Sequence, residues 1–305
     1  MISASVTLPA TCGEWVQGTL DGVPCLVSCA INWHASVRLE LQGTNGSEPR
    51  PPTRTGQTQA RPGASDHSLA DLWQLPPDRP KAVCALRRAL AARNVPGSGG
   101  ALIVQNPLPR GRGYASSTVD VAGTIFAVGE SVGTPFTPAE VARLATAVEP
   151  SDSIMFTRPT LLAHRDASFF RPLGPSPRLA VVVLDPGGNV DTLAFNCEDH
   201  GPIMKELAPQ HRDLFAMLEA GLEQDDAALV ARAATGSALT HQRILYSELV
   251  ECVSGWMGRI GAIGICRAHS GTLVGLLCDP DSAPEVGAQA VERLPGVTIR
   301  ICRAA

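Results

Sequence analysis

The sequence predicts an α+β fold, because strand-like and helix-like segments mix in both halves of the chain without regular alternation. The chain has 305 residues, which suits one large domain or two of ordinary size. Hydrophobic residues make up 44% of it and charged residues 18%, a balance that fits a globular protein with a sizeable core. No internal repeat is visible, and the irregular order of elements argues against a barrel.

Charge and hydropathy argue against several classes of partner. The net charge is −4, so a basic surface for nucleic acid is not expected. No apolar run approaches the roughly 20 residues that span a bilayer, so no membrane partner is expected. The N-terminus lacks the charged start and apolar block of a signal peptide, which predicts a cytoplasmic protein. The nine cysteines occur singly, which favours reduced core thiols over disulfides or zinc ligands.

Three strands and one helix are predicted before residue 95. Residues 2–8 and 35–41 alternate apolar and polar side chains, and residues 25–31 form a third strand-like run. Residues 43–68 are dense in Gly, Pro, Thr, Ser and Gln, so we expect a long and mobile loop there. Residues 83–92 have a helical pattern that ends near an Asn-Val-Pro-Gly sequence.

A strand, a glycine-rich loop and two helices are predicted next. Residues 101–104 form a short apolar run of strand type, and apolar residues at helical spacing over 121–128 predict a helix. A second helix begins at Thr137, a favourable N-cap, with a proline in its first turn. Glu140 completes a capping box, so we expect it to be structural, and the helix ends at Glu149.

The second half of the chain mixes three helices with four strands. A Pro- and Gly-rich break at residues 172–177 is a plausible domain boundary, which divides the chain into residues 1–171 and 172–305. The predicted helices are residues 203–220, 225–234 and 237–259, and the predicted strands are residues 179–184, 262–267, 272–278 and 297–302.

The glycine-rich loop has the composition of a phosphate-binding cradle. Glycine lets the backbone approach a ligand closely, and the free N–H groups at a helix start attract an anion. A serine hydroxyl at this position could also hold the magnesium ion of a nucleotide. The loop matches neither the Walker A motif nor the dinucleotide fingerprint, and the alternative is a tight turn with a serine-rich helix cap. The expected nucleotide-binding residues are Pro109, Arg110, Gly111, Arg112, Gly113, Tyr114, Ala115, Ser116, Ser117 and Thr118.

Two carboxylates follow the second predicted helix. Glu149 lies where the helix dipole is negative and disfavours a carboxylate, and Asp152 comes three residues later. Together they could attract a cation, and an aspartate can orient or deprotonate an attacking hydroxyl. The alternative is a polar connecting loop, in which Asp and Ser are ordinary turn residues.

Three separated segments together resemble the GHMP kinase superfamily, which includes galactokinase, homoserine kinase and mevalonate kinase. They are residues 9–18, residues 111–118 and residues 264–275. Within the superfamily, the motifs are most similar to those of the L-threonine kinases of cobalamin synthesis and salvage. The matching segments are Gly-Glu-Trp-Val-Gln-Gly at 13–18, the loop through residue 120, Glu-Pro-Ser-Asp-Ser-Ile-Met-Phe at 149–156 and Ala-His-Ser-Gly-Thr at 268–272.

The resemblance implies a two-domain GHMP kinase fold. Its N-terminal α/β domain, here residues 1–171, would contain a left-handed βαβ crossover and bind ATP, and residues 172–305 would form a ferredoxin-like domain. The implied reaction phosphorylates the side-chain hydroxyl of L-threonine with ATP and Mg²⁺, giving O-phospho-L-threonine for the aminopropanol linker of cobalamin. A kinase of homoserine or another small alcohol, and a nucleotide-binding regulator without catalysis, remain open. The protein would be a monomer or a homodimer.

The resemblance also implies roles for individual residues. Ser117 and Glu149 match the magnesium ligands, and Asp152 matches the aspartate that acts as base in several members. The lysine of many first motifs is absent here, and Arg112 is a candidate for the missing cation. Each proposed substrate residue has a structural alternative, as a turn residue, a carboxylate that stabilises a helix start, or a shaper of the third loop. These substrate residues are Glu14, Gln17, Asp120, Ser270 and Gly271.

Overall fold

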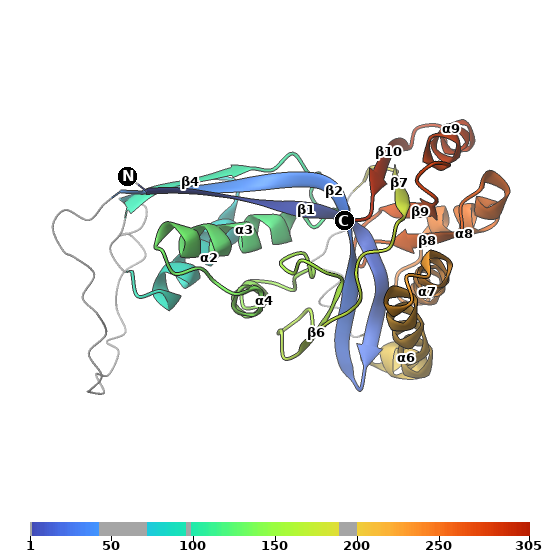
Figure 1. Ribbon diagram of the computed structural model, residues 1–305, viewed down its shortest axis with the longest axis horizontal. Coiled ribbons are helices and arrows are strands. Elements are labelled where there is room, and N and C mark those ends of the chain that lie inside the picture. The colour runs from blue at the N-terminus through green and yellow to red at the C-terminus, as the bar shows by residue number, and fades with distance from the viewer. Residues whose placement is uncertain (1, 43–71, 96–98, 189–199) are drawn as a thin grey trace.

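The computed structural model describes residues 2–42, 72–95, 99–188 and 200–305. It has the predicted α+β architecture, built on a ten-stranded sheet whose main path runs β10-β7-β9-β8-β1-β2-β4-β3 (Figure 1). The predicted loop at residues 43–68 lies outside the described residues. None of the described helices is long and apolar enough to cross a bilayer.

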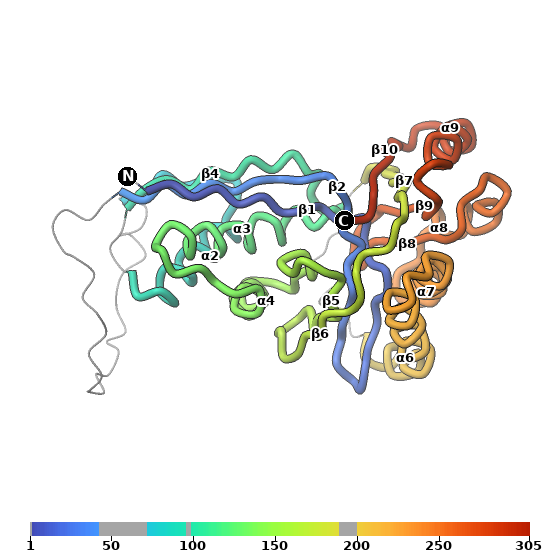
Figure 2. The backbone as a smooth tube through the Cα atoms, in the orientation of Figure 1, coloured from blue at the N-terminus to red at the C-terminus, as the bar shows by residue number. Residues whose placement is uncertain are grey.

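Two long antiparallel strands, β1 (Ile2–Leu20) and β2 (Val23–Gln42), connect the two parts of the molecule. Figure 2 shows that they run side by side and bend together near their middle. The bend coincides with register shifts in β1 between Pro9 and Val16, as expected of bulges, which bend a strand. The sequence prediction of separate strands at 25–31 and 35–41 is therefore wrong, because β2 continues through both.

Three helices cover one face of the β1–β2–β4 part of the sheet (Figure 1). The capping box of Thr137 and Glu140 is confirmed, because each side chain accepts a hydrogen bond from the backbone N–H of the other. The helix that it starts ends at Thr146, earlier than predicted, although the Glu149 N–H still donates to the Ala145 carbonyl at 3.0 Å. The elements of this part are β3 (Trp73–Gln74), α2 (Pro80–Ala92), β4 (Gly99–Gln105), α3 (Ser116–Ser131) and α4 (Pro138–Thr146).

The second half contributes four strands and two helices that pack against β1. The strands are β7 (Ala180–Asp185), β8 (Gly264–Arg267), β9 (Val274–Cys278) and β10 (Thr298–Arg303). The packed helices are α6 (Gly201–Glu223) and α7 (Ala227–His241). All four strands agree with the sequence prediction.

The predicted helix over residues 237–259 is wrong. Helix α7 continues to His241, and α8 (Glu248–Ser254) starts anew where the Ser247 side chain accepts from the Val250 N–H. A 3₁₀ turn, Met257–Ile260, follows. The sequence analysis also missed α9 (Ala283–Arg293) and the short hairpin of β5 (Thr160–Leu162) and β6 (Phe170–Pro172).

Candidate active site

The first motif, residues 9–18, lies against the glycine-rich loop because β1 bends beside it. The backbone N–H of Gly13 and the hydroxyl of Thr11 both donate to the Gly113 carbonyl, at 3.3 and 2.8 Å. The Thr11 N–H donates to the Tyr114 carbonyl at 3.2 Å. These bonds join two segments that are about a hundred residues apart in sequence, and they fix the loop backbone from one side.

The third motif, residues 264–275, fixes the same loop from the other side. The N–H groups of Thr272 and Leu273 both donate to the Arg112 carbonyl at 3.0 Å. A Cβ atom at Gly271 would lie 2.3 Å from that carbonyl oxygen, so only glycine permits this approach. A Cβ atom at Gly113 would lie 2.3 Å from the Cβ of Ala268, which is fully buried. The structure thus brings all three motifs together.

The loop leads into α3 with its hydroxyls on two faces. The Ser116 hydroxyl donates to the Leu108 carbonyl at 3.2 Å, on the scaffold side. The next two residues point the other way, towards the turn that follows α4 at residues 149–152, here called the acidic turn. The Ser117 hydroxyl donates to Glu149 Oε1, and the Thr118 hydroxyl donates to Asp152 Oδ2 at 2.7 Å. The two predicted carboxylates therefore lie at the N-terminus of α3, where its dipole is positive.

A lysine completes this arrangement. Lys81, in the first turn of α2, places its Nζ 2.5 Å from Glu149 Oε2. Sequence reasoning missed it, since 68 residues separate the two partners. Arg112, the cation proposed from the sequence, instead donates to Asp185 Oδ2 at 2.9 Å, and the Tyr114 hydroxyl donates to the same oxygen at 3.1 Å.

A second buried carboxyl lies beside Asp152. Glu14 projects from β1, and burial together with the charge of Asp152 raises the pKa of Glu14 well above its usual value. Burial also raises the pKa of Asp152, against hydrogen bonds from Thr118 and Glu14 that lower it. Two neighbouring carboxyls in such a place favour a shared proton, held by Glu14. The Oε2 atom of Glu14 has no hydrogen-bond partner within the described residues.

Gln17 and Asp120, both proposed to touch substrate, have their side chains bonded within the protein. The Gln17 Oε1 lies 2.5 Å from Nδ1 of His269, and its Nε2 donates to the Arg267 carbonyl at 3.5 Å. Asp120 accepts from Nη1 of Arg79 and from Nδ2 of Asn106, both at 2.6 Å. These contacts favour positioning roles for both residues.

The remaining predicted residues lie in the third motif or at the edge of the loop. Ser270 is half-buried in the turn between β8 and β9, next to Gly271. Arg110 is exposed and ion-paired with Asp78 at 2.5 Å. His269 packs at 5.0 Å from the ring of His164, and burial lowers the pKa of His269 to about 4. The third motif thus contributes backbone support and a neutral imidazole.

The donor atoms fit a magnesium ion. Mg²⁺ prefers oxygen ligands and usually binds through one or two carboxylates together with phosphate oxygens. The Ser117 hydroxyl and the Glu149 carboxylate face each other, and the Lys81 ammonium shows that this carboxylate attracts a cation. The described residues contain no group of three or more His, Cys, Asp and Glu side chains able to hold a metal. Tight binding of the ion would therefore require nucleotide phosphates as additional ligands.

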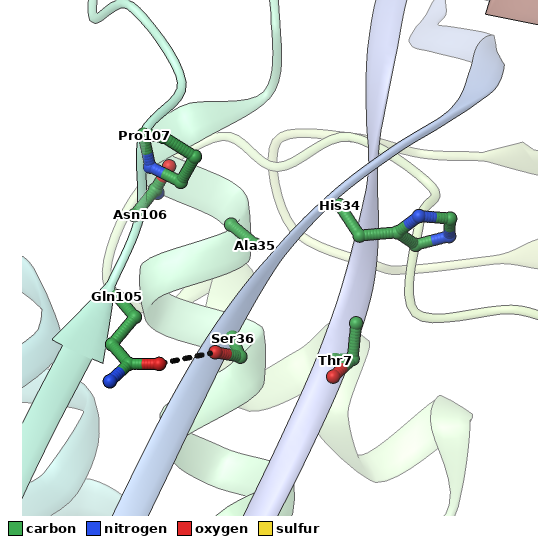
Figure 3. A pocket seen from close by; sticks show the side chains of 7 residues that line it. All are labelled: Thr7, His34, Ala35, Ser36, Gln105, Asn106 and Pro107. Atoms are coloured by element: carbon green, nitrogen blue, oxygen red, sulfur yellow. Dashed lines mark hydrogen bonds between the residues drawn. The ribbon is translucent and has the colours of Figure 1, made fainter.

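Two hollows lie outside this constellation. One of about 520 Å³ opens across β1, β2 and the end of β4, where the Ser36 hydroxyl donates to Oε1 of Gln105 (Figure 3). Its lining includes Asn106 but none of the predicted site residues. A second hollow, of about 410 Å³, is lined in part by Ser28 and Ser153. The backbone N–H group of each of these serines donates to the hydroxyl of the other. Ser153 directly follows Asp152, so this hollow adjoins the acidic turn.

Comparison with known proteins agrees with this geometry. Residues 80–158, which span α2, the loop, α3, α4 and the acidic turn, match the family model of the GHMP kinases N terminal domain. The chain is 28% identical over 272 residues to an L-threonine kinase of Citrobacter freundii, covering 89% of this chain and 85% of that one. It is 27% identical over 275 residues to an L-threonine kinase of Salmonella typhimurium, covering 89% and 81%.

The fold is that of solved GHMP kinases. A homoserine kinase structure from Cytophaga hutchinsonii superposes with a TM-score of 0.69 at 15% identity, covering all of this chain and 95% of that one. A mevalonate kinase structure from Methanococcus jannaschii superposes with a TM-score of 0.66 at 14% identity, covering 99% and 98%. At such low identity, these structures identify the fold alone.

Proposed function

We propose that this chain, which carries a GHMP kinase N-terminal domain and the fold of the GHMP kinases, is an L-threonine kinase. It would transfer the γ-phosphoryl group of ATP to the side-chain hydroxyl of L-threonine. The family supports a kinase acting on a small alcohol, and the two L-threonine kinase relatives support the choice of acceptor. The product would be O-phospho-L-threonine, which provides the aminopropanol linker of cobalamin. The protein would act in the cytoplasm as a monomer or a homodimer.

One observation carries the proposal: Glu149 and Asp152, three residues apart, bond to the consecutive hydroxyls of Ser117 and Thr118. This places an acidic turn directly on the helix start that follows the glycine-rich loop. Phosphoryl transfer needs donors for the phosphate oxygens, a cation for their charge, and a group that handles the hydroxyl proton. The loop N–H groups, the pair of Ser117 and Glu149, and Asp152 would supply these three functions.

The reaction would proceed with a simple balance of bonds and protons. The threonine hydroxyl oxygen forms a bond to the γ-phosphorus, the bond to the bridging oxygen breaks, and ADP leaves. The hydroxyl proton passes to the carboxylate of Asp152. Burial raises the pKa of Asp152, which makes it a better proton acceptor, and the Thr118 hydroxyl fixes its orientation. Bound Mg²⁺ would neutralise phosphate charge as the negative charge shifts towards ADP.

The proposed domain division follows the same resemblance. Residues 1–171 would carry the nucleotide, and residues 172–305 would support the loop through the third motif. The hydrogen bonds of Thr272 and Leu273 to the Arg112 carbonyl supply that support. The remaining substrate assignments, Glu14 and Ser270 among them, stay proposals.

The deciding experiment is a panel of acceptors with Mg-ATP: L-threonine, L-serine, L-homoserine and D-threonine. ADP release and the phosphorylated product are both measured, with Asp152→Asn as the control for contaminating kinases. Stoichiometric O-phospho-L-threonine with a strong preference for L-threonine supports the proposal. Turnover of L-homoserine or L-serine in its place rejects threonine as the acceptor, and ATP binding with no turnover of any acceptor rejects the proposed activity.

A further inference from the structure

The ion pair of Lys81 with Glu149 stands out from the surface ion pairs of this chain. Only two lysines, Lys81 and Lys205, occur among the 25 basic residues, and one of them lies on the carboxylate proposed to bind the metal. The lysine side chain is 45% exposed, whereas that of Glu149 is only 15% exposed. Lys81 therefore reaches from solvent into the site, and its flexible stem could follow a moving partner.

Neither charge is favoured by the dipole of the helix that it adjoins along the chain. Lys81 lies in the first turn of α2, where the dipole is positive and where no acidic residue is present. Glu149 lies just beyond the end of α4, where the dipole is negative. Each charge is thus at the unfavourable end of its own helix. The positive N-terminus of α3 compensates for Glu149 alone, so the position of Lys81 is explained by its carboxylate partner or by a ligand.

The start of α2 is held firmly against α3. Arg79, two residues before Lys81, forms an ion pair of 2.6 Å with Asp120 of α3, and both side chains are largely buried. Arg79 also donates to the Asn106 carbonyl at 3.3 Å, just before the glycine-rich loop. These contacts fix the backbone of Lys81 beside the N-terminus of α3, while its own side chain stays partly exposed to solvent.

A position of this kind suits the third phosphate of ATP. The first motif, which often supplies a lysine in the superfamily, has Thr11 and Cys12 in that region. The guanidinium of Arg112 is bonded to the buried carboxylate of Asp185, and that of Arg110 to Asp78. Lys81 is the basic side chain that the described residues place on the pair of Ser117 and Glu149.

We propose that Lys81 occupies the cation position at Glu149 in the free protein and moves to the γ-phosphate when the metal–nucleotide complex binds. The inference rests on the proposed ATP-dependent function, but it does not depend on which alcohol is phosphorylated. It predicts two opposite effects of removing the lysine charge. The metal should bind more tightly in the absence of nucleotide, and ATP should bind less tightly relative to ADP.

Chemical labelling of the wild-type protein tests the position directly. Reductive methylation followed by peptide mass spectrometry measures the reaction rate of both lysines, and Lys205, exposed on α6, is an internal control. With Mg²⁺ and a non-hydrolysable ATP analogue, the rate at Lys81 should fall roughly tenfold, because a charge-assisted contact to phosphate protects it. Equal protection by ADP and the ATP analogue, or no protection at all, overturns the proposal.

Binding measurements on Lys81→Met complete the test, with Lys205→Met as the matched control. Calorimetry without nucleotide or acceptor should show Mg²⁺ affinity raised about two- to fivefold in Lys81→Met, as removal of a competing exposed ion pair predicts. Affinity for the ATP analogue with Mg²⁺ should fall roughly tenfold or more, while affinity for ADP changes little. If Lys81→Met weakens both nucleotides equally, the lysine serves the structure only and the proposal is wrong. Failure of every acceptor in the panel would leave these binding results intact, so the two proposals can fail separately.

Discussion

Replacing Gly113 by alanine should break the contact between the glycine-rich loop and the third motif. Gly113 has a φ of +107°, and an added Cβ would lie 2.3 Å from the Cβ of Ala268. An L side chain at positive φ costs about 1–2 kcal/mol. Overpacking against a buried neighbour adds about 1–3 kcal/mol, so Gly113→Ala should lower the free energy of unfolding by roughly 2–5 kcal/mol. Urea unfolding followed by tryptophan fluorescence measures this change.

Two further variants separate the backbone effect from the overlap. Gly133 also has a positive φ, +70°, but no described atom lies within 4 Å of the position that an added Cβ would take, so Gly133→Ala should cost only the backbone term, about 1–2 kcal/mol. Adding Ala268→Gly to Gly113→Ala removes the overlap, because the next atoms are 3.5 and 3.7 Å away. The double variant should recover about 1–3 kcal/mol relative to the sum of the single changes. Strict additivity would refute the reasoning that these two residues are in direct contact.

Four other variants, with a fifth as a control, test the acidic turn and its supports. Asp152→Asn should lower kcat about a hundred- to ten-thousandfold without loss of nucleotide affinity, measured by steady-state kinetics and calorimetry. Glu149→Gln should weaken Mg²⁺ affinity in the nucleotide complex at least about tenfold, measured by metal titration. Asp120→Ala should cost about 1–3 kcal/mol in urea unfolding, because Arg79 and Asn106 lose a buried carboxylate acceptor while Arg79 keeps Asp78 and the Asn106 carbonyl. Glu206→Ala, at an exposed ion pair, should cost much less. The stability of Glu14→Gln relative to the wild type should increase as pH rises from 5 to 8. Thermal unfolding of both proteins across this pH range measures the difference. Because the folded-state pKa of Glu14 lies above the unfolded value of 4.5, the wild type loses stability as pH rises through that raised pKa.

Much of the fold was predictable because local patterns agreed with tertiary structure. The alternating residues of β1, the capping box at Thr137 and the four strands of the second half all follow their sequence signals. The failures have local causes. The first strand was predicted over residues 2–8 only, but β1 continues through bulges to Leu20. Residues 242–247 break the long helix predicted over 237–259, through reciprocal bonds between the Gln242 side chain and the Ser247 backbone. The missed α9 has a proline in its first turn, a signal that was available.

The site was predictable where glycine restricts the backbone and not where single charges meet across the fold. The glycines at 113 and 271 are required by close approaches, so the motifs that contain them were recognisable. Lys81 and Asp185 carry no such local signal, because their partners Glu149 and Arg112 are 68 and 73 residues away. An aspartate that ends a strand, or a lysine in a first helical turn, is too common to identify without its partner.

Helix geometry explains why Asp120 and the hydroxyls of Ser117 and Thr118 meet different partners. Successive residues of a helix turn by roughly 100°, so positions four apart share a face, whereas the two positions that follow the first point away from that face. Ser116 and Asp120 lie four apart, and Nδ2 of Asn106 donates to the Ser116 carbonyl at 2.9 Å and to Asp120 at 2.6 Å. Ser117 and Thr118 point elsewhere, to the two acids of the turn. One face of α3 thus bonds to Asn106, and another bonds to the acids Glu149 and Asp152. We therefore expect a change at Asp120 to lower the free energy of unfolding more than it lowers phosphorylation of the acceptor. Changes at Ser117 and Thr118 should have the opposite effect.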